Sequence, residues 1–189
     1  LVEKIKMRNR DRVDLTRPKE LSIEATVNLV TNHLARYYQQ NAPRLPQLAI
    51  YAVYQCLVEQ VSRYKGCTLE PLARMKSADR KAKTIGDIVV VRDGTPFEAV
   101  EIKYGQPIKF VHVSEAIDKV RTLPVRRYYM LSTQDVDAAE WEQIQERKEA
   151  FLKQNGCEII LNGVLHSLSY YLRLLPNTTE FIMHYASLV

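Results

Sequence analysis

The residues whose types and spacing most clearly suggest chemistry are Asp87, Glu101 and Lys103. They lie near the two ends of the segment 84–105, whose apolar runs on either side of Asp93-Gly94 predict a β-hairpin. The hairpin brings the aspartate and glutamate together, and Lys103 shares the face of Glu101 because side chains alternate along a strand. Two neighbouring carboxylates favour a bound cation, and Mg²⁺ usually takes one or two carboxylates together with waters and a substrate phosphate. A nearby lysine could orient or deprotonate a water, or balance charge as a phosphodiester is attacked.

Two registers of this hairpin can be compared. A two-residue loop at Asp93-Gly94 would put Asp87 opposite Val100 and turn Glu101 to the other face. A three-residue loop that adds Thr95 puts Asp87 opposite Glu101 and leaves fewer apolar side chains facing charges, so we predict this register. It also pairs Val89 with Ala99, Val91 with Phe97 and Ile88 with Val100. The alternative is a hairpin without chemistry, in which Glu101 and Lys103 are solvated at its exit and Asp87 caps a turn.

The run Gly86-Asp87-Ile88, followed by Glu101-Ile102-Lys103, resembles the PD-(D/E)XK nuclease superfamily, which includes many type II restriction endonucleases. Gly86 stands where the motif's name has proline. The resemblance covers roughly residues 47–162 and implies that Asp87 and Glu101 hold Mg²⁺, with Mn²⁺ as a substitute. Lys103 would then orient the attacking water or steady the phosphate.

The number of metal ions is left open by the motif. In many members of the superfamily an acid from a preceding helix joins the metal site, and Glu59, within a helix expected over 47–64, is the candidate here. The alternative is that Glu59 is an exposed helix residue. A second metal would need another ligand of this kind.

The net charge of +5 is unevenly distributed. Residues 74–83 hold five basic side chains against one acid and run directly into Asp87, so we expect them to contact DNA phosphates. Gln106, three residues beyond Lys103, is a further candidate for substrate contact, with a turn residue as the alternative. The basic arm 1–20 is interpreted as a solvated segment. The five basic residues are Arg74, Lys76, Arg80, Lys81 and Lys83.

Periodicity predicts the elements that must position this site. Two helices precede the hairpin, and helices then alternate with strands, which predicts an α/β single domain with a mixed central sheet flanked by helices on both faces. Within the single domain 1–189, residues 47–162 form the expected catalytic core and 163–189 the C-terminal helices. The expected ranges after the hairpin are a helix from Ser114 to Pro124, a strand 126–132, a helix 137–155, a strand 157–161, a helix 164–175 and a last helix 179–189.

Other chemistries lack their signatures. The chain has no glycine-rich phosphate loop, no dinucleotide fingerprint and no paired metal spacing among its four histidines. We therefore expect no organic cofactor. No apolar run approaches the length of a membrane span, and no signal peptide is visible. Three cysteines without metal spacing predict free thiols in a reducing cytoplasm. Because residue 1 is Leu1, the chain is interpreted as a fragment candidate, for example of a nuclease–methyltransferase fusion.

The function expected from these observations and the resemblance is a Mg²⁺-dependent DNA endonuclease in the cytoplasm of a prokaryotic cell. Cutting both strands at a palindromic site implies a homodimer with two active sites related by a two-fold axis. Two alternatives stay open. One is a nuclease of the same superfamily that acts in DNA repair, transposition or RNA processing. The other is a nucleic-acid-binding or protein-interaction domain that performs no chemistry.

Overall fold

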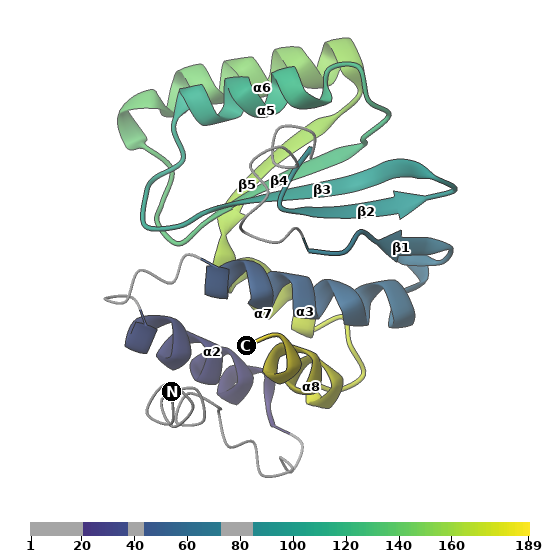
Figure 1. Cartoon of the computed structure of the whole chain (residues 1–189). Coiled ribbons are helices and arrows are strands. Elements are labelled where there is room, and N and C mark those ends of the chain that lie inside the picture. The colour runs from purple at the N-terminus through teal and green to yellow at the C-terminus, as the bar shows by residue number, and fades with distance from the viewer. Residues whose placement is uncertain (1–20, 38–43, 73–84) are drawn as a thin grey trace, which may run out of the picture.

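Five strands form one mixed sheet, in which they lie in the order of the chain (Figure 1). This computed structural model describes residues 21–37, 44–72 and 85–189. Strands β1 and β3 each pair antiparallel with β2, whereas β3, β4 and β5 pair parallel. The carboxyl ends of β3, β4 and β5 therefore meet the start of β2 at one edge of the sheet. The strands are β1 (Cys67–Leu69), β2 (Ile88–Arg92), β3 (Thr95–Lys103), β4 (Arg127–Ser132) and β5 (Glu158–Gly163).

Helices cover both faces of this sheet, as predicted (Figure 1). The helices α5 (Phe110–Val120) and α6 (Trp141–Asn155) follow β3 and β4 and lie together on one face. Both belong to parallel strand–helix–strand units, whose common handedness places successive helices on the same side. The other face packs against α3 (Arg44–Gln60) and α7 (Val164–Leu172). Beyond them lie α2 (Ile23–Tyr37) and α8 (Thr179–Leu188). The described residues also include two single turns of 3₁₀ helix, Ser62–Tyr64 and Ala138–Glu140.

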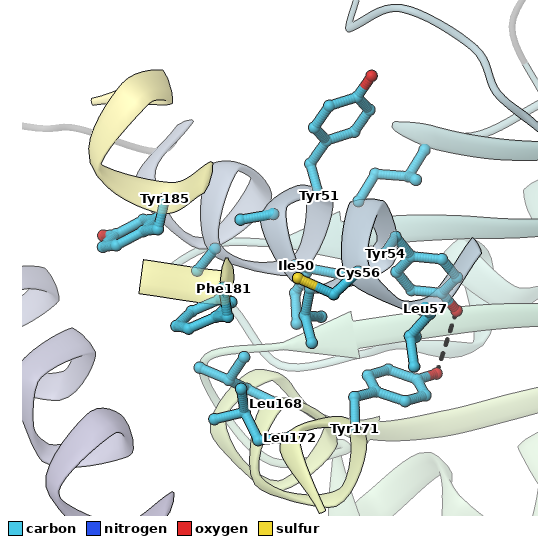
Figure 2. Close-up of a cluster of buried hydrophobic side chains, with 14 of the residues drawn as sticks. Ile50, Tyr51, Tyr54, Cys56, Leu57, Leu168, Tyr171, Leu172, Phe181 and Tyr185 are labelled. Carbon is cyan, nitrogen blue, oxygen red and sulfur yellow. Dashed lines mark hydrogen bonds between the residues drawn. The ribbon is translucent and has the colours of Figure 1, made fainter. Parts of the chain in front are cut away.

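The core on the α3 side is the larger of the two hydrophobic cores. Helix α3 is apolar around most of its circumference and is buried on several sides, as its composition predicts. Figure 2 shows its side chains between the sheet and the α7 and α8 residues, with the Tyr54 hydroxyl 3.1 Å from that of Tyr171. The labelled residues of this cluster are Ile50, Tyr51, Tyr54, Cys56, Leu57, Leu168, Tyr171, Leu172, Phe181 and Tyr185.

The hairpin β2–β3 has the register of a two-residue loop near its turn and the register predicted for a three-residue loop near its open end. Near the turn, Arg92 pairs with Thr95 across a two-residue loop, and Asp93 and Gly94 both adopt positive φ. Near the open end, Ile88 pairs with Val100 and Val89 with Ala99, as predicted. A bulge reconciles the two registers.

The predicted three-residue loop and the predicted pairing of Val91 with Phe97 are therefore wrong. Val91 pairs with Pro96, and Phe97 is the extra residue of the bulge. The guanidinium carbon of Arg92 lies 3.9 Å from the centre of the Phe97 ring. This cation–π contact compensates for the interrupted ladder.

Several boundaries differ from the predictions. Strand β1 was not predicted, because three residues with no second apolar run give no periodicity signal. Helix α3 spans 44–60, not 47–64, and the third helix begins at Phe110, not Ser114. The backbone N–H of Phe110 donates a 2.5 Å hydrogen bond to the carboxylate of Glu140, so this helix is capped by a residue thirty positions away. Such a cap has no local sequence signal.

All three cysteines are buried free thiols, as predicted. Among the residues that the structure describes, no helix has the length and apolarity needed to cross a bilayer.

Candidate active site

Asp87 lies just before β2, at the sheet edge where β3 ends. Its Oδ2 accepts a 2.8 Å hydrogen bond from the backbone N–H of Ile102, and its carbonyl oxygen accepts one from Nε2 of Gln47 at 3.2 Å. Gly86 makes this close approach feasible, because a Cβ there would lie only 2.8 Å from the carbonyl oxygen of Val100. The glycine at the motif's proline position is thus required by the local backbone packing.

Glu101 lies on the α5 face of β3 and is surrounded by cationic and phenolic groups. Its Oε1 lies 3.2 Å from the Nζ of Lys103. Its Oε2 lies 3.4 Å from the Nζ of Lys119, on α5, and accepts a 3.3 Å hydrogen bond from the hydroxyl of Tyr128, on β4. The side chain is 17% exposed, so the cluster is open to solvent. The prediction that Glu101 and Lys103 share a face is confirmed.

The pKa of the Tyr128 hydroxyl is affected by the charges of both carboxylates. Burial raises the pKa of its hydroxyl far above the usual value, and the negative charge of Glu101, its hydrogen bond to Glu101 and the charge of Asp87 raise this pKa further. The phenol therefore stays protonated and remains a hydrogen-bond donor. Because Oδ2 of Asp87 accepts the N–H of Ile102, the residue after Glu101, both carboxylates lie at the same edge of the sheet.

His112, in the first turn of α5, lies close enough to Lys103 and Glu101 for their charges to affect its pKa. Its pKa is lowered by burial and then by the positive charge of Lys103, against the opposing charges of Glu115 and Glu101. The ring Nδ1 accepts a 3.1 Å hydrogen bond from the backbone N–H of Lys109, so the neutral ring carries its proton on Nε2. At neutral pH His112 is therefore an uncharged N–H donor.

The donor set suits Mg²⁺ better than a transition metal. Within the residues 21–37, 44–72 and 85–189, no group of three or more His, Cys, Asp or Glu side chains is arranged to hold a metal. Asp87 and Glu101 provide two carboxylates, which is the number that Mg²⁺ usually takes when waters and a phosphate complete its coordination. Two lysines and one phenol balance Glu101 here, and a bound cation would take over part of that role. The residues present thus fit this ion.

Glu59 is not brought to this site. It is exposed on α3, which packs on the face of β3 that carries Val100, whereas Glu101 points to the opposite face. Gln60, the residue after Glu59, hydrogen-bonds to Glu180 of α8, so this end of α3 lies against α8. The structure thus agrees with the alternative that Glu59 is an exposed helix residue.

The expected DNA-contacting residues have mixed outcomes. Gln106 is exposed in the turn after β3, on the same sheet edge as Lys103, and its carbonyl oxygen accepts a 2.7 Å hydrogen bond from Ser132. The five basic residues Arg74, Lys76, Arg80, Lys81 and Lys83, and the arm 1–20, lie outside the described residues.

Lys119 is the site residue that sequence reasoning missed. It is one of three lysines in the described helices, with Lys148 and Lys153, and it reaches Glu101 only because α5 packs back against β3. A signal was available, because Lys119 follows His112 by seven residues and so lies on the same side of the helix. His112 and Tyr128 are also near the site, brought there by α5 and β4.

No model of a known protein family matches this chain, and no curated protein shows significant sequence similarity to it.

Proposed function

We propose that this chain is a Mg²⁺-dependent endodeoxyribonuclease that hydrolyses DNA phosphodiester bonds. One observation carries the proposal, namely the convergence of Asp87, Glu101 and Lys103 at the open end of one hairpin. The aspartate is held by the N–H of Ile102 at 2.8 Å, and the lysine lies 3.2 Å from the glutamate. Two carboxylates that share a partly exposed edge with two ammonium groups suit a cation and a phosphate together.

Each residue has a distinct role in the proposed reaction. Asp87 and Glu101 would hold the Mg²⁺ ion, which supplies Lewis-acid activation of the phosphate and of a water molecule when it is bound. Lys103 orients the attacking water and balances the charge that builds up on the phosphate. Lys119 and Tyr128 position Glu101 through its Oε2. The water oxygen forms a new bond to phosphorus and the bond from phosphorus to one ester oxygen breaks. The protons of the attacking water pass to solvent, and the departing ester oxygen takes one proton from solvent to become a hydroxyl group.

Plasmid cleavage tests this proposal directly. The wild-type chain is expected to nick and linearise plasmid DNA with Mg²⁺ or Mn²⁺ and to lose this activity in EDTA. Lys103→Ala and Asp87→Ala should each abolish cleavage while DNA affinity stays within about threefold, because the two residues act on the reacting phosphate. Lys153→Ala, at an exposed lysine of α6, is the matched control and should cleave normally. Unchanged cutting by both site variants would remove the proposed mechanism.

A nucleic-acid-binding domain without chemistry is the second candidate. The observation that favours it is the neutralisation of Glu101 by Lys103 and Lys119, which resembles a structural ion-pair cluster. Such a domain would show salt-dependent DNA binding and no metal-stimulated cleavage. The plasmid assay with and without Mg²⁺ therefore separates the two candidates.

The substrate and assembly are part of the same proposal. Digestion of unmethylated genomic DNA into discrete bands would identify a site-specific restriction enzyme, whereas preferential cutting of ends, flaps or RNA would indicate repair, transposition or RNA processing. We also propose that the active form is a homodimer in the cytoplasm of a prokaryotic cell. Sedimentation of the protein with and without a short duplex tests the dimer.

A further inference from the structure

A cavity of about 390 Å³ lies at the carboxyl ends of β4 and β5, on the α3 side of the sheet edge whose α5 side carries Glu101 and Lys103. Its walls come from the loops after β3 and β4, from the second half of α2 and from the first turn of α7. Tyr104, which directly follows Lys103, lines it. Thr133, which also lines it, donates a backbone hydrogen bond of 3.1 Å to the carbonyl oxygen of Lys103. The cavity therefore adjoins the backbone of Lys103, whose side chain lies on the other face of the sheet.

The lining combines flat or apolar walls with a polar rim. Leu34 and Leu165 provide apolar surface, and Tyr104 and His166 provide rings. The rim carries Thr133, Gln134 and Asp135. A planar heteroaromatic ring with a hydrogen-bonding edge fits such walls, and the volume lies within the range of small-ligand sites.

The rim also indicates which hydrogen-bonding edge would be accepted. Thr133 Oγ1 accepts a 2.8 Å hydrogen bond from the N–H of Gly105, so its own hydroxyl proton is available to donate. Gln134 donates through Nε2 to the carbonyl oxygen of Gly105 at 3.1 Å, so its Oε1 remains an acceptor. The exposed carboxylate of Asp135 adds a charged acceptor and disfavours an anion such as phosphate. Acceptors therefore dominate, which favours a ring with an exocyclic amino group.

We propose that this cavity holds the base of one unpaired nucleotide of a DNA strand that crosses this sheet edge, with the attacked phosphate on the Lys103 side. The inference rests on the proposed function and adds the state of its substrate. Enzymes that take a base out of the helix hold it between aromatic and apolar side chains and read its edge through hydrogen bonds. Adenine, cytosine and guanine each carry an exocyclic amino group that can donate to Asp135. Thymine has none, and its single ring N–H lies between two carbonyl oxygens that the carboxylate repels.

Binding in EDTA tests the proposal without any need for cleavage. The probes are a fully paired 20-base-pair duplex and the same duplex with one unpaired adenine, each measured by fluorescence anisotropy. The wild-type chain should bind the bulged duplex at least tenfold more tightly. Ala35→Trp fills the cavity from the exposed side of α2 and should reduce this preference to within twofold. Asn32→Trp, at an exposed α2 position that does not line the cavity, should retain it.

Base identity gives a second measurement. An unpaired thymine should be bound about tenfold less tightly than an unpaired adenine, and Asp135→Asn should remove most of that difference. No preference of the wild-type chain for the bulged duplex, or a preference that survives Ala35→Trp, would overturn the proposal. Tight binding of free deoxyadenosine without a preference for bulged DNA would overturn it too, because the cavity would then serve a free nucleoside.

The two proposals fail in distinguishable ways. If the protein prefers bulged DNA but does not cleave DNA with Mg²⁺, only the nuclease proposal is contradicted. If it cleaves plasmid DNA but binds bulged and fully paired DNA equally well, only the cavity proposal is contradicted.

Discussion

Two glutamates on β3, Glu98 and Glu101, lie three residues apart and face opposite sides of the sheet. Glu98 is fully buried and accepts hydrogen bonds from Tyr54 at 2.5 Å, Tyr64 at 2.9 Å and Arg63 at 2.8 Å. Glu101, 17% exposed, contacts two lysines and one tyrosine at 3.2 to 3.4 Å. Both carboxylates contact cations and phenols, but the contacts of Glu98 are buried and short, whereas those of Glu101 are partly exposed and longer.

The difference shows how the surroundings of a carboxylate determine its use. Around Glu98, the partners supply the hydrogen bonds that a buried charge requires, and little room is left for a ligand. Around Glu101, the longer contacts leave lone pairs for another cation, and a second carboxylate, Asp87, lies on the same edge. The buried and fully paired carboxylate of Glu98 is suited to stabilising the fold. The partly exposed cluster around Glu101, which has two lysines at one carboxylate, is suited to binding a ligand.

The largest expected effect is the loss of cleavage in Glu101→Gln. An amide is a poor Mg²⁺ ligand, so cleavage should fall about a thousandfold, roughly 4 kcal/mol of transition-state stabilisation. The free energy of unfolding should change by less than about 1 kcal/mol, because the ion pairs at Glu101 are partly solvated. Plasmid cleavage rates and urea unfolding measure the two quantities. Retained cleavage would show that Glu101 is a structural residue like Glu98.

Glu98→Gln should have the opposite result. The amide cannot accept from Arg63 and both phenols at once, so a buried donor loses its partner and the free energy of unfolding should fall by about 3 kcal/mol. Cleavage per folded molecule should remain near the wild-type rate, since Glu98 points away from Asp87. Urea unfolding and cleavage at low temperature measure these effects. A variant as stable as the wild type would contradict the structural role of Glu98.

Gly86→Ala sharpens the comparison at the open site. Its new Cβ would lie 2.8 Å from the carbonyl oxygen of Val100, so the segment that carries Asp87 must shift away from β3. We expect about tenfold slower cleavage and a loss of roughly 1–2 kcal/mol in unfolding free energy from the local overpacking. Cleavage kinetics and thermal unfolding measure both. Wild-type cleavage would show that the position of Asp87 tolerates this shift.

The smallest effect concerns alkaline pH at the Glu98 side. Burial raises the pKa of Tyr64 above its usual value of 10.0, and the charge of Glu98 raises it further. The folded state keeps this proton when the unfolded state loses it, so the contribution to stability is complete below pH 10 and is lost as pH rises above that value. Tyr64→Phe should therefore reduce the fall in unfolding free energy above pH 10 by up to about 1.4 kcal/mol per pH unit. Urea unfolding at pH 9 to 11 measures the slope, and an unchanged slope would contradict the assignment.

Much of the fold and the centre of the site could be predicted from local patterns. The α/β class follows from alternating helical and strand periodicity, and the Asp93-Gly94 turn gives the hairpin. The meeting of Asp87 with the Glu101 strand follows from the hairpin's length. The bulge at Phe97 was missed, because it depends on Arg92 packing over the ring across the sheet. Lys119 was missed for a related reason, since its contact with Glu101 depends on which face of the sheet α5 covers.

The sequence by itself determined that Glu101 and Lys103 share a face and that an aspartate lies near them, because strand alternation and a tight turn are local constraints. Only the tertiary structure decided that Lys119 and Tyr128 contact Glu101, that Glu98 is enclosed by Arg63 and two tyrosines, and that a cavity opens beside Tyr104. Those features require segments far apart in the chain to pack against particular faces of the sheet. Local pattern does not specify that packing, since the burial of the whole core determines it.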